Sequence, residues 1–299
     1  MIMIKTGTLI SERYRIVNRI GSGGMAEVYD ALDIVSKEHV ALKIIHEELI
    51  TDKTVVKRFE TEARVAASLN HPNIIKVHNV GTSGGRPYIV NELVKGQTVR
   101  SILDYRGNLS LKEACDIMLQ LTSAVSHAHQ KKVIHCDIKT NNFFLMPDGS
   151  VKLADFGLAR FEETEKKKTN DVEEIAGSVH YLAPEVLQGY QTTYLSDVYS
   201  LGIVFFELLT GQLPYDEGTK TTIAASHVNK AFPRITKFLP KIPIEVEKLI
   251  EKATQKKPQL RFVSVEEMNI AVNNIINNDE VMKGKKTLLQ RVFGFKGED

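Results

Sequence analysis

The hydrophobic pattern changes once along this chain of 299 residues, close to Gly96. Residues 14–93 carry short β-branched segments separated by glycine and asparagine, which is typical of an antiparallel sheet. Within them, residues 55–69 repeat apolar side chains at helical spacing between charged ones, which predicts one inserted helix. After Gly96 the apolar positions follow the helical period. The pattern therefore predicts an α+β protein, with a sheet and one helix in its first part and a mainly helical second part.

Capping residues mark helix boundaries in the second part. Ser110 and Ser264 each stand three residues before a glutamate and open an apolar repeat, which fits a capping box at a helix start. The most apolar repeat covers residues 195–210 and is followed by Gly211, a residue type that commonly ends helices. We expect this helix to be the buried centre of the second part.

Composition restricts the class of protein and its partners. Lys and Arg total 39 against 37 Asp and Glu, so the net charge gives no reason to expect nucleic acid as a partner. The two cysteines, Cys115 and Cys136, are too few for a disulfide framework and are typical of a reducing compartment. The longest strongly apolar uncharged run, residues 198–206, is far shorter than the roughly 20 residues that span a bilayer. These features predict a cytoplasmic protein.

A glycine cluster lies between two predicted strands, in the string Ile20-Gly21-Ser22-Gly23-Gly24. Its place between two strands, and not between a strand and a helix, argues against a dinucleotide-binding turn. Glycines in such a turn let backbone N–H groups approach phosphates closely, because a Cβ would collide with the ligand. A plain hairpin turn would leave the same pattern. The cluster therefore indicates a phosphate site only in combination with other motifs.

Lys43 ends the apolar strand that follows, after Val40, Ala41 and Leu42. A buried lysine needs a carboxylate partner or an anion. The inserted helix carries two candidate carboxylates, Glu60 and Glu62. A solvated lysine at a sheet edge is the alternative interpretation.

Two polar clusters flank a predicted β-hairpin at residues 143–153. The first cluster, residues 135–142, contains Asp137 and Asn142, and Asp155 opens the second. Because the two strands of a hairpin are antiparallel, its open end brings both clusters together. Asp and Asn oxygens are hard ligands suited to a Mg²⁺ ion that holds a nucleotide. Each cluster alone could be a turn with a capping Asp, but together they predict a site for Mg²⁺ and a nucleotide.

Taken in order, these strings resemble the protein kinase signature set. The glycine cluster with its following lysine matches, as do His-Cys-Asp-Ile-Lys-Thr-Asn-Asn at residues 135–142 and Asp-Phe-Gly at residues 155–157. Ala-Pro-Glu at residues 183–185 resembles the end of the family's activation loop. Arg261 lies where the family pairs an arginine with Glu185. Five ordered motifs make this resemblance specific.

The resemblance extends over residues 14–279. The motif sequences are most similar to those in the intracellular part of bacterial Ser/Thr receptor kinases of the PASTA type. It implies a bilobal kinase fold with an N-lobe at residues 1–94, a C-lobe at residues 95–279 and a basic tail at residues 280–299. The implied activity is transfer of the γ-phosphoryl group of ATP to Ser and Thr hydroxyls of proteins, with autophosphorylation. A pseudokinase or scaffold without transfer is the alternative. As part of a longer receptor, the domain would lie at the cytoplasmic face of a membrane.

The resemblance implies four catalytic residues. Asp137 would orient the substrate hydroxyl and accept its proton, and Lys139 would contact the γ-phosphate. Lys43 would bind the α- and β-phosphates and pair with a helix glutamate. Glu62 is chosen over Glu60 for this pairing because of its spacing from the His-Pro-Asn string that follows.

ATP and a metal ion are the implied cofactors. Asn142 and Asp155 would hold Mg²⁺, with Mn²⁺ as the alternative ion. Apolar side chains would enclose the adenine, with Phe144 or Leu145 on its second side, and the backbone of residues 92–94 would read the edge of the base. The full ATP-binding set is Ile20, Gly21, Ser22, Gly23, Gly24, Val28, Ala41, Lys43, Asn91, Glu92, Val94, Phe144 and Leu145.

Four residues depart from the family pattern, one of them Thr140, which stands where the family usually has a proline. Ala26 stands in place of the third glycine of the turn, and Cys136 replaces the arginine that usually precedes the catalytic Asp. Asn91 occupies the gatekeeper position, where a larger apolar side chain is more common. None of these changes removes a group that would contact metal or phosphate, so an active enzyme is expected.

Two polar segments lead to expectations about regulation. Residues 161–177 lack periodicity and form a predicted loop in which Thr164 and Thr169 are the expected autophosphorylation sites. Such a reaction implies self-association between copies of the chain. Residues 283–299 mix basic and apolar side chains, and both contact with an anionic membrane surface and a solvated linker remain open.

Overall fold

The structure, a computed structural model, describes residues 4–161 and 179–278. The chain forms two compact units, each built from two stretches of sequence. The first unit contains Met1–Ser101 and Ser123–Lys166, and the second contains Ile102–Thr122 and Lys167–Asp299. The lobe boundaries implied by the resemblance remain a prediction.

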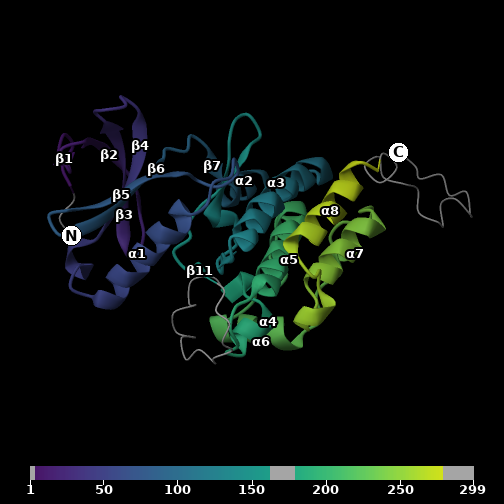
Figure 1. The fold of residues 1–299 in the computed structure, drawn as a ribbon. Helices are drawn as coiled ribbons and strands as arrows, with labels where there is room; N and C mark the ends of the chain where they lie inside the picture. The colour runs from purple at the N-terminus through teal and green to yellow at the C-terminus, as the bar shows by residue number, and fades with distance from the viewer. Residues whose placement is uncertain (1–3, 162–178, 279–299) are drawn as a thin grey trace, which may run out of the picture. The chain divides into compact units, whose positions relative to one another are not determined.

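A six-stranded antiparallel sheet opens the first unit (Figure 1). Its spatial order is β1-β2-β3-β4-β6-β5, so β4 and β6 are neighbours and β5 lies at one edge. The strands are β1 (Leu9–Ile10), β2 (Tyr14–Ser22), β3 (Ala26–Asp33), β4 (His39–Ile45), β5 (Val77–Ser83) and β6 (Arg86–Glu92). The predicted sheet over residues 14–93 is confirmed, and β1 adds a short edge strand that the pattern does not indicate.

Strand β4 shows how the alternation of side chains prepares the site. Val40, Leu42 and Ile44 are buried in a core with side chains of the neighbouring strands. Because successive side chains of a strand point to opposite faces, Ala41 and Lys43 lie on the other face, and both are partly exposed. The sheet therefore carries a lysine on the face that this core does not occupy.

Helix α1 (Lys53–Ala67) is the helix predicted among the strands. The Asp52 side chain caps its start by accepting hydrogen bonds from two backbone N–H groups of the first turn. The helix packs against β5 and β6 and buries Phe59 and Glu62. A carboxylate on a buried helix face needs a cationic partner.

Two smaller sheets complete the first unit. The first has the order β10-β9-β7, and the second pairs β8 with β11. Their strands are β7 (Gln97–Thr98), β8 (Val133–Ile134), β9 (Phe143–Leu145), β10 (Val151–Leu153) and β11 (Arg160–Phe161). At the open end of the β9–β10 hairpin, the Ala154 N–H donates to the Asn142 carbonyl oxygen at 2.8 Å. The hairpin therefore joins the two polar clusters, as the pattern predicts.

Helices dominate the second part of the chain, and α5 is its buried centre. The helices are α2 (Val99–Arg106), α3 (Leu111–Gln130), α4 (Pro184–Leu187), α5 (Tyr194–Thr210), α6 (Lys220–Asn229), α7 (Ile244–Ala253) and α8 (Val265–Ile276). Helix α5 packs against α7 and α8, and residues 196–209 are all buried. It ends at Gly211, whose φ of 70° lies in the left-handed region. A Cβ at Gly211 would collide with the carbonyl oxygen of Gly107.

The two predicted capping boxes have different outcomes. At the start of α3, the Glu113 N–H donates to Ser110 Oγ and the Ser110 N–H donates to Glu113 Oε2, which completes the box. At the start of α8, the Glu267 N–H donates to Ser264 Oγ at 3.1 Å. Glu267 Oε2 accepts instead from the Val263 N–H at 2.7 Å. The serine caps α8 as predicted, but its glutamate reaches one residue further back.

None of the described helices is both long enough and apolar enough to cross a membrane. Apart from Phe161, the predicted loop at residues 161–177 lies outside the described residues, and so does the tail at residues 283–299. The expectations for Thr164, Thr169 and the basic tail therefore concern parts of the chain that the structure does not describe.

Candidate active site

An ion pair joins Lys43 of β4 to Glu62 of α1. The two side chains are 19% and 7% exposed. Glu60, the other candidate partner, is exposed on the same helix. The alternation of β4 and the period of α1 thus bring one lysine and one glutamate together in a mostly buried position.

The surroundings of Lys43 favour its charged form. Burial by itself lowers the pKa of the Lys43 amine, but the carboxylates of Glu62 and Asp155 outweigh burial and raise that pKa above its ordinary value. Asp155 Oδ1 lies 4.0 Å from Lys43 Nζ. Glu62 Oε2 is buried and has no hydrogen-bond partner among the described residues. The lysine is therefore held as a cation that contacts one carboxylate and faces a second.

Asp137 lies between β8 and β9 and is held through one of its oxygens. Lys139 Nζ donates to Asp137 Oδ2 at 2.6 Å, and Asn142 Nδ2 donates to the same oxygen at 2.9 Å. Asn142 Nδ2 also lies 2.8 Å from the Asp137 carbonyl oxygen. Asp137 Oδ1 receives no hydrogen bond from the described residues. The carboxylate is therefore oriented while one oxygen stays available to accept a proton.

Asp155 presents its carboxylate outward from the end of β10. Its φ of 61° lies in the left-handed region, and its side chain is 48% exposed. Asp155 Oδ1 accepts a hydrogen bond from the Gly157 N–H at 3.2 Å, and a Cβ at Gly157 would lie only 2.9 Å from that oxygen. Phe156 is buried beside His135, with 4.7 Å between ring centroids. The glycine thus permits a tight turn that anchors Phe156 inside and leaves Asp155 accessible.

The turn between β2 and β3 has open space beside Gly24. Neither Gly23 nor Gly24 has a left-handed φ, and a Cβ at Gly24 would meet no atom within 4 Å. The packing of the protein itself therefore does not require glycine at this position. The Gly24 N–H donates to no acceptor among the described residues. A free N–H beside open space fits a phosphate group, whose approach a Cβ would block.

The residues predicted to enclose the adenine lie on adjacent strands. In the ladder, Val28 of β3 is opposite Lys43, and Ala41 of β4 is opposite Asn91 of β6. These side chains are partly exposed, and Ile20 at the end of β2 is 47% exposed. An accessible, mostly apolar strip beside Lys43 fits a planar base.

Phe144 and Leu145 are neighbours in β9 and both are partly exposed. Successive residues of a strand face opposite sides, so only one of the two can cover the base. The choice between them stays a prediction.

The segment after β6 has unused backbone groups. The N–H and the carbonyl oxygen of Val94 make no backbone hydrogen bond with described residues, so both can read the edge of a base.

The Glu92 side chain is held in place, because Lys152 Nζ lies 2.8 Å from its Oε1 and the Lys76 N–H donates to that oxygen at 3.1 Å. Lys152 is not recognisable from the sequence as a site residue. The sequence signal for Lys152 is the alternation of β10, in which Val151 and Leu153 are buried and Lys152 between them is partly exposed.

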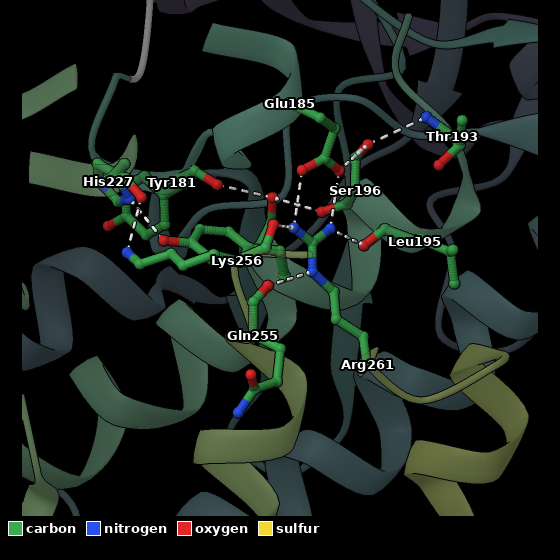
Figure 2. Close-up of polar contacts among 11 residues, drawn as sticks. Tyr181, Glu185, Thr193, Leu195, Ser196, His227, Gln255, Lys256 and Arg261 are labelled. Carbon is green, nitrogen blue, oxygen red and sulfur yellow. Dashed lines mark hydrogen bonds and ion pairs between the residues drawn. The ribbon is translucent and has the colours of Figure 1, made fainter. Parts of the chain in front are cut away.

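In the second unit, Arg261 pairs with Glu185 (Figure 2). Its Nη1 and Nη2 each lie 2.7 Å from a Glu185 oxygen. The remaining N–H groups reach the carbonyl oxygens of Leu195, Gln255 and Lys256. The arginine side chain is fully buried, and all five of its N–H donors have an acceptor. The structure thus contains the buried bidentate pair that the resemblance implies.

Metal binding at the site needs oxygen atoms from a ligand. No group of three or more His, Cys, Asp or Glu side chains in residues 4–161 and 179–278 is arranged to hold a metal ion. Asn142 and Asp155 could supply one oxygen each, which is too few for a Mg²⁺ ion with octahedral coordination. Phosphate oxygens of a nucleotide and water would complete such a set. The residues therefore fit a cation that binds together with a nucleotide.

A profile of the protein kinase domain matches residues 14–271. The chain belongs to the protein kinase domain family. The serine/threonine-protein kinase PrkC of Bacillus subtilis is 40% identical over 283 residues, which is 94% of this chain and 43% of PrkC. The probable serine/threonine-protein kinase PknB of Lactococcus lactis is 39% identical over 268 residues, which is 89% of this chain and 42% of PknB. The kinase domain therefore spans less than half the length of these two relatives.

A solved structure supports the same assignment. The crystal structure of a point mutant of the Mycobacterium tuberculosis PknI kinase domain matches with a TM-score of 0.71 and 26% identity, covering 91% of this chain and 99% of that domain. The predicted kinase fold, its α+β class and the resemblance to bacterial Ser/Thr kinases are confirmed. Members of this family use ATP with a divalent cation.

Proposed function

We propose that this kinase domain transfers the γ-phosphoryl group of ATP to serine and threonine hydroxyls of proteins, with Mg²⁺ as the cation and Mn²⁺ as the alternative. The observation that carries the proposal is the charged Lys43, which is paired with Glu62 and lies 4.0 Å from the accessible carboxylate of Asp155. An ammonium beside an accessible carboxylate suits a polyphosphate that arrives with a cation. The relatives named as Ser/Thr kinases support the substrate class.

Phosphoryl transfer needs positioning and charge neutralisation more than covalent chemistry from the protein. Lys43 binds the α- and β-phosphates, and Glu62 holds the lysine in place. Asn142 and Asp155 hold the cation, which supplies neutralising charge to the phosphates when bound. The Gly24 N–H and its open surroundings receive the phosphate chain.

Asp137 and Lys139 act at the attacking hydroxyl. Asp137 Oδ1, which has no donor among the described residues, accepts the hydrogen bond of the substrate hydroxyl and then its proton. Lys139 is bound to Oδ2 at 2.6 Å and keeps the carboxylate oriented. Its positive charge also offsets the charge that develops on the transferred phosphate.

Transfer of radiolabelled phosphate from ATP to purified proteins tests the proposed function, with Asp137→Asn as the comparison. The asparagine keeps an oxygen that can accept from Lys139 and removes the proton acceptor. We expect transfer by the wild type and a loss of at least about 100-fold in the variant. A wild type that binds ATP but transfers no phosphate would support the scaffold alternative instead.

Asn91 leads to a prediction about nucleotide selectivity. Its side chain is partly exposed, lies opposite Ala41 in the ladder and makes no hydrogen bond that ties it to described residues. We therefore expect ATP analogues with a bulky N6 substituent to compete with ATP in the wild type. An Asn91→Met variant, whose longer side chain narrows the same space, should exclude them. Analogues that fail to compete in both proteins would contradict the prediction.

Cys136 leads to a prediction about activation. Its thiol lies 3.5 Å from the Ile134 carbonyl oxygen and offers no guanidinium to a phosphate on the loop. We expect a Thr164→Ala/Thr169→Ala variant to keep its rate on an added substrate within about tenfold of wild type, or about 1.4 kcal/mol in barrier. The measurement compares autophosphorylated and phosphatase-treated wild type with this variant.

The converse variant, Cys136→Arg, should depend more strongly on loop phosphorylation. If dephosphorylation lowers the rate of the wild type on the added substrate a hundredfold, the prediction is wrong. Another cation then supplies the charge that Cys136 lacks.

A further inference from the structure

His46 makes two hydrogen bonds to the glycine-rich turn. The ladder between β3 and β4 ends at the pair Ala26 and Ile45, so residues 23–25 lie beyond it. The His46 N–H donates to the Met25 carbonyl oxygen at 2.9 Å. The Nε2 atom of the His46 ring lies 2.9 Å from the carbonyl oxygen of Gly23. A side chain outside the predicted ATP-binding set thus holds the turn from the side of β4.

The position of His46 is itself fixed. Its side chain is buried, with only 6% of the residue exposed. The carbonyl oxygen of the preceding Ile45 accepts two hydrogen bonds from Arg86, at 3.0 Å from Nε and 2.7 Å from Nη2. Because a carbonyl oxygen only accepts, His46 Nε2 must carry a hydrogen in this contact. The imidazole therefore acts as a fixed donor to the turn.

The contact determines the direction of one peptide group. In a trans peptide the carbonyl oxygen and the following N–H point to opposite sides. Holding the Gly23 carbonyl oxygen toward His46 therefore turns the Gly24 N–H away from His46. That N–H has no acceptor among the described residues, and the space beside Gly24 is open. The Gly23 N–H is already used, since it donates to the Ala26 carbonyl oxygen at 2.9 Å.

We propose that His46 is a positioning residue that holds the glycine-rich turn in the shape that receives the phosphates of ATP. This inference rests on the proposed function, because it assigns the Gly24 N–H to a phosphate. Without the imidazole donor, the turn would have to become ordered when the nucleotide binds. The cost should appear mainly as weaker ATP binding, because the groups that contact the hydroxyl and the cation stay in place.

The decisive comparison is between His46→Gln and His46→Met. Glutamine and methionine have similar lengths, but only glutamine can donate a hydrogen bond near the position of Nε2. We expect His46→Met to raise the KM for ATP about fivefold to tenfold and to change kcat less than about threefold. His46→Gln should stay within about twofold of wild type in both. Assays are run where thermal melts show all proteins to be folded.

His39→Leu is the matched control. His39 begins the same strand and binds Asp30 Oδ1 through Nδ1 at 2.6 Å, but it is exposed and makes no contact with the turn. Its KM for ATP should equal that of wild type. The proposal would be overturned if the Gln and Met variants had the same KM for ATP, whether that value equals the wild-type KM or is higher.

Calorimetric titration with Mg²⁺-ATP separates failure of this inference from failure of the proposed function. If the wild type binds ATP without transferring phosphate, the proposed function fails, and the dissociation constants of the Gln and Met variants still decide the role of His46. That role is supported if the dissociation constant for ATP is fivefold to tenfold larger in His46→Met than in wild type and is not raised in His46→Gln. A wild type that binds no ATP would overturn both.

Discussion

Asp155→Asn is expected to lower the phosphate transfer rate at least about 1000-fold and to leave the melting temperature unchanged. The substitution keeps an oxygen in the place of Asp155 Oδ1, which accepts from the Gly157 N–H at 3.2 Å. It removes the negative charge that faces Lys43 and that would hold the cation. Because the side chain is 48% exposed, the fold does not depend on that charge. Initial rates with labelled ATP and a thermal melt measure the two effects.

Asp148→Asn is the matched control for this prediction. Asp148 Oδ1 accepts from the Ser150 N–H at 2.9 Å, which is the same bond, two residues ahead, that Asp155 makes. Asp148 lies in the turn of the hairpin and is exposed. Its amide variant should transfer phosphate at the wild-type rate. If both variants lose activity equally, or if Asp155→Asn retains most of its rate, the cation-binding role is wrong.

Lys43→Met is a less specific test of the site than Asp155→Asn. In the structure, Glu62 is buried and Lys43 is its cationic partner. Removing the lysine leaves a buried carboxylate without its counter-charge, which is costly for folding. Lost activity in that variant would therefore combine a chemical and a structural cause.

Arg261→Met is expected to lower the free energy of unfolding by about 3–5 kcal/mol, the cost of breaking a buried ion pair by removing one partner. The fully buried guanidinium makes a bidentate pair with Glu185 and satisfies three backbone carbonyl oxygens. Methionine fills part of the volume but leaves the carboxylate and those oxygens without donors. A decrease of about 10 °C in melting temperature should accompany the loss.

Two variants check the cause of this destabilisation. Adding Glu185→Met to Arg261→Met removes the unpaired carboxylate and should recover part of the stability. Lys112→Met breaks an exposed pair with Asp116 on α3 and should melt with the wild type. A melting temperature for Arg261→Met equal to that of wild type would show that the buried pair is not a source of stability.

Local patterns in the sequence determined the elements that carry the site. The apolar run that ends at Lys43 identified a strand, and the turn residues between two short strands identified the β9–β10 hairpin. Gly211 marked the end of α5, because few other residue types adopt its left-handed φ. These inferences succeed because strand and helix periods, capping and turn geometry depend on residues that are close in the chain.

Only the tertiary structure decided which distant groups meet. Lys152 and Glu92 form an ion pair although 60 residues separate them, and the His46 imidazole binds Gly23 across 23 residues. The pair of Arg261 and Glu185 follows from resemblance, but its complete set of backbone acceptors does not. Such contacts depend on how strands and helices pack against one another, and no spacing in the sequence encodes that geometry. The order of polar residues thus determined the family, while packing decided which distant side chains contact one another.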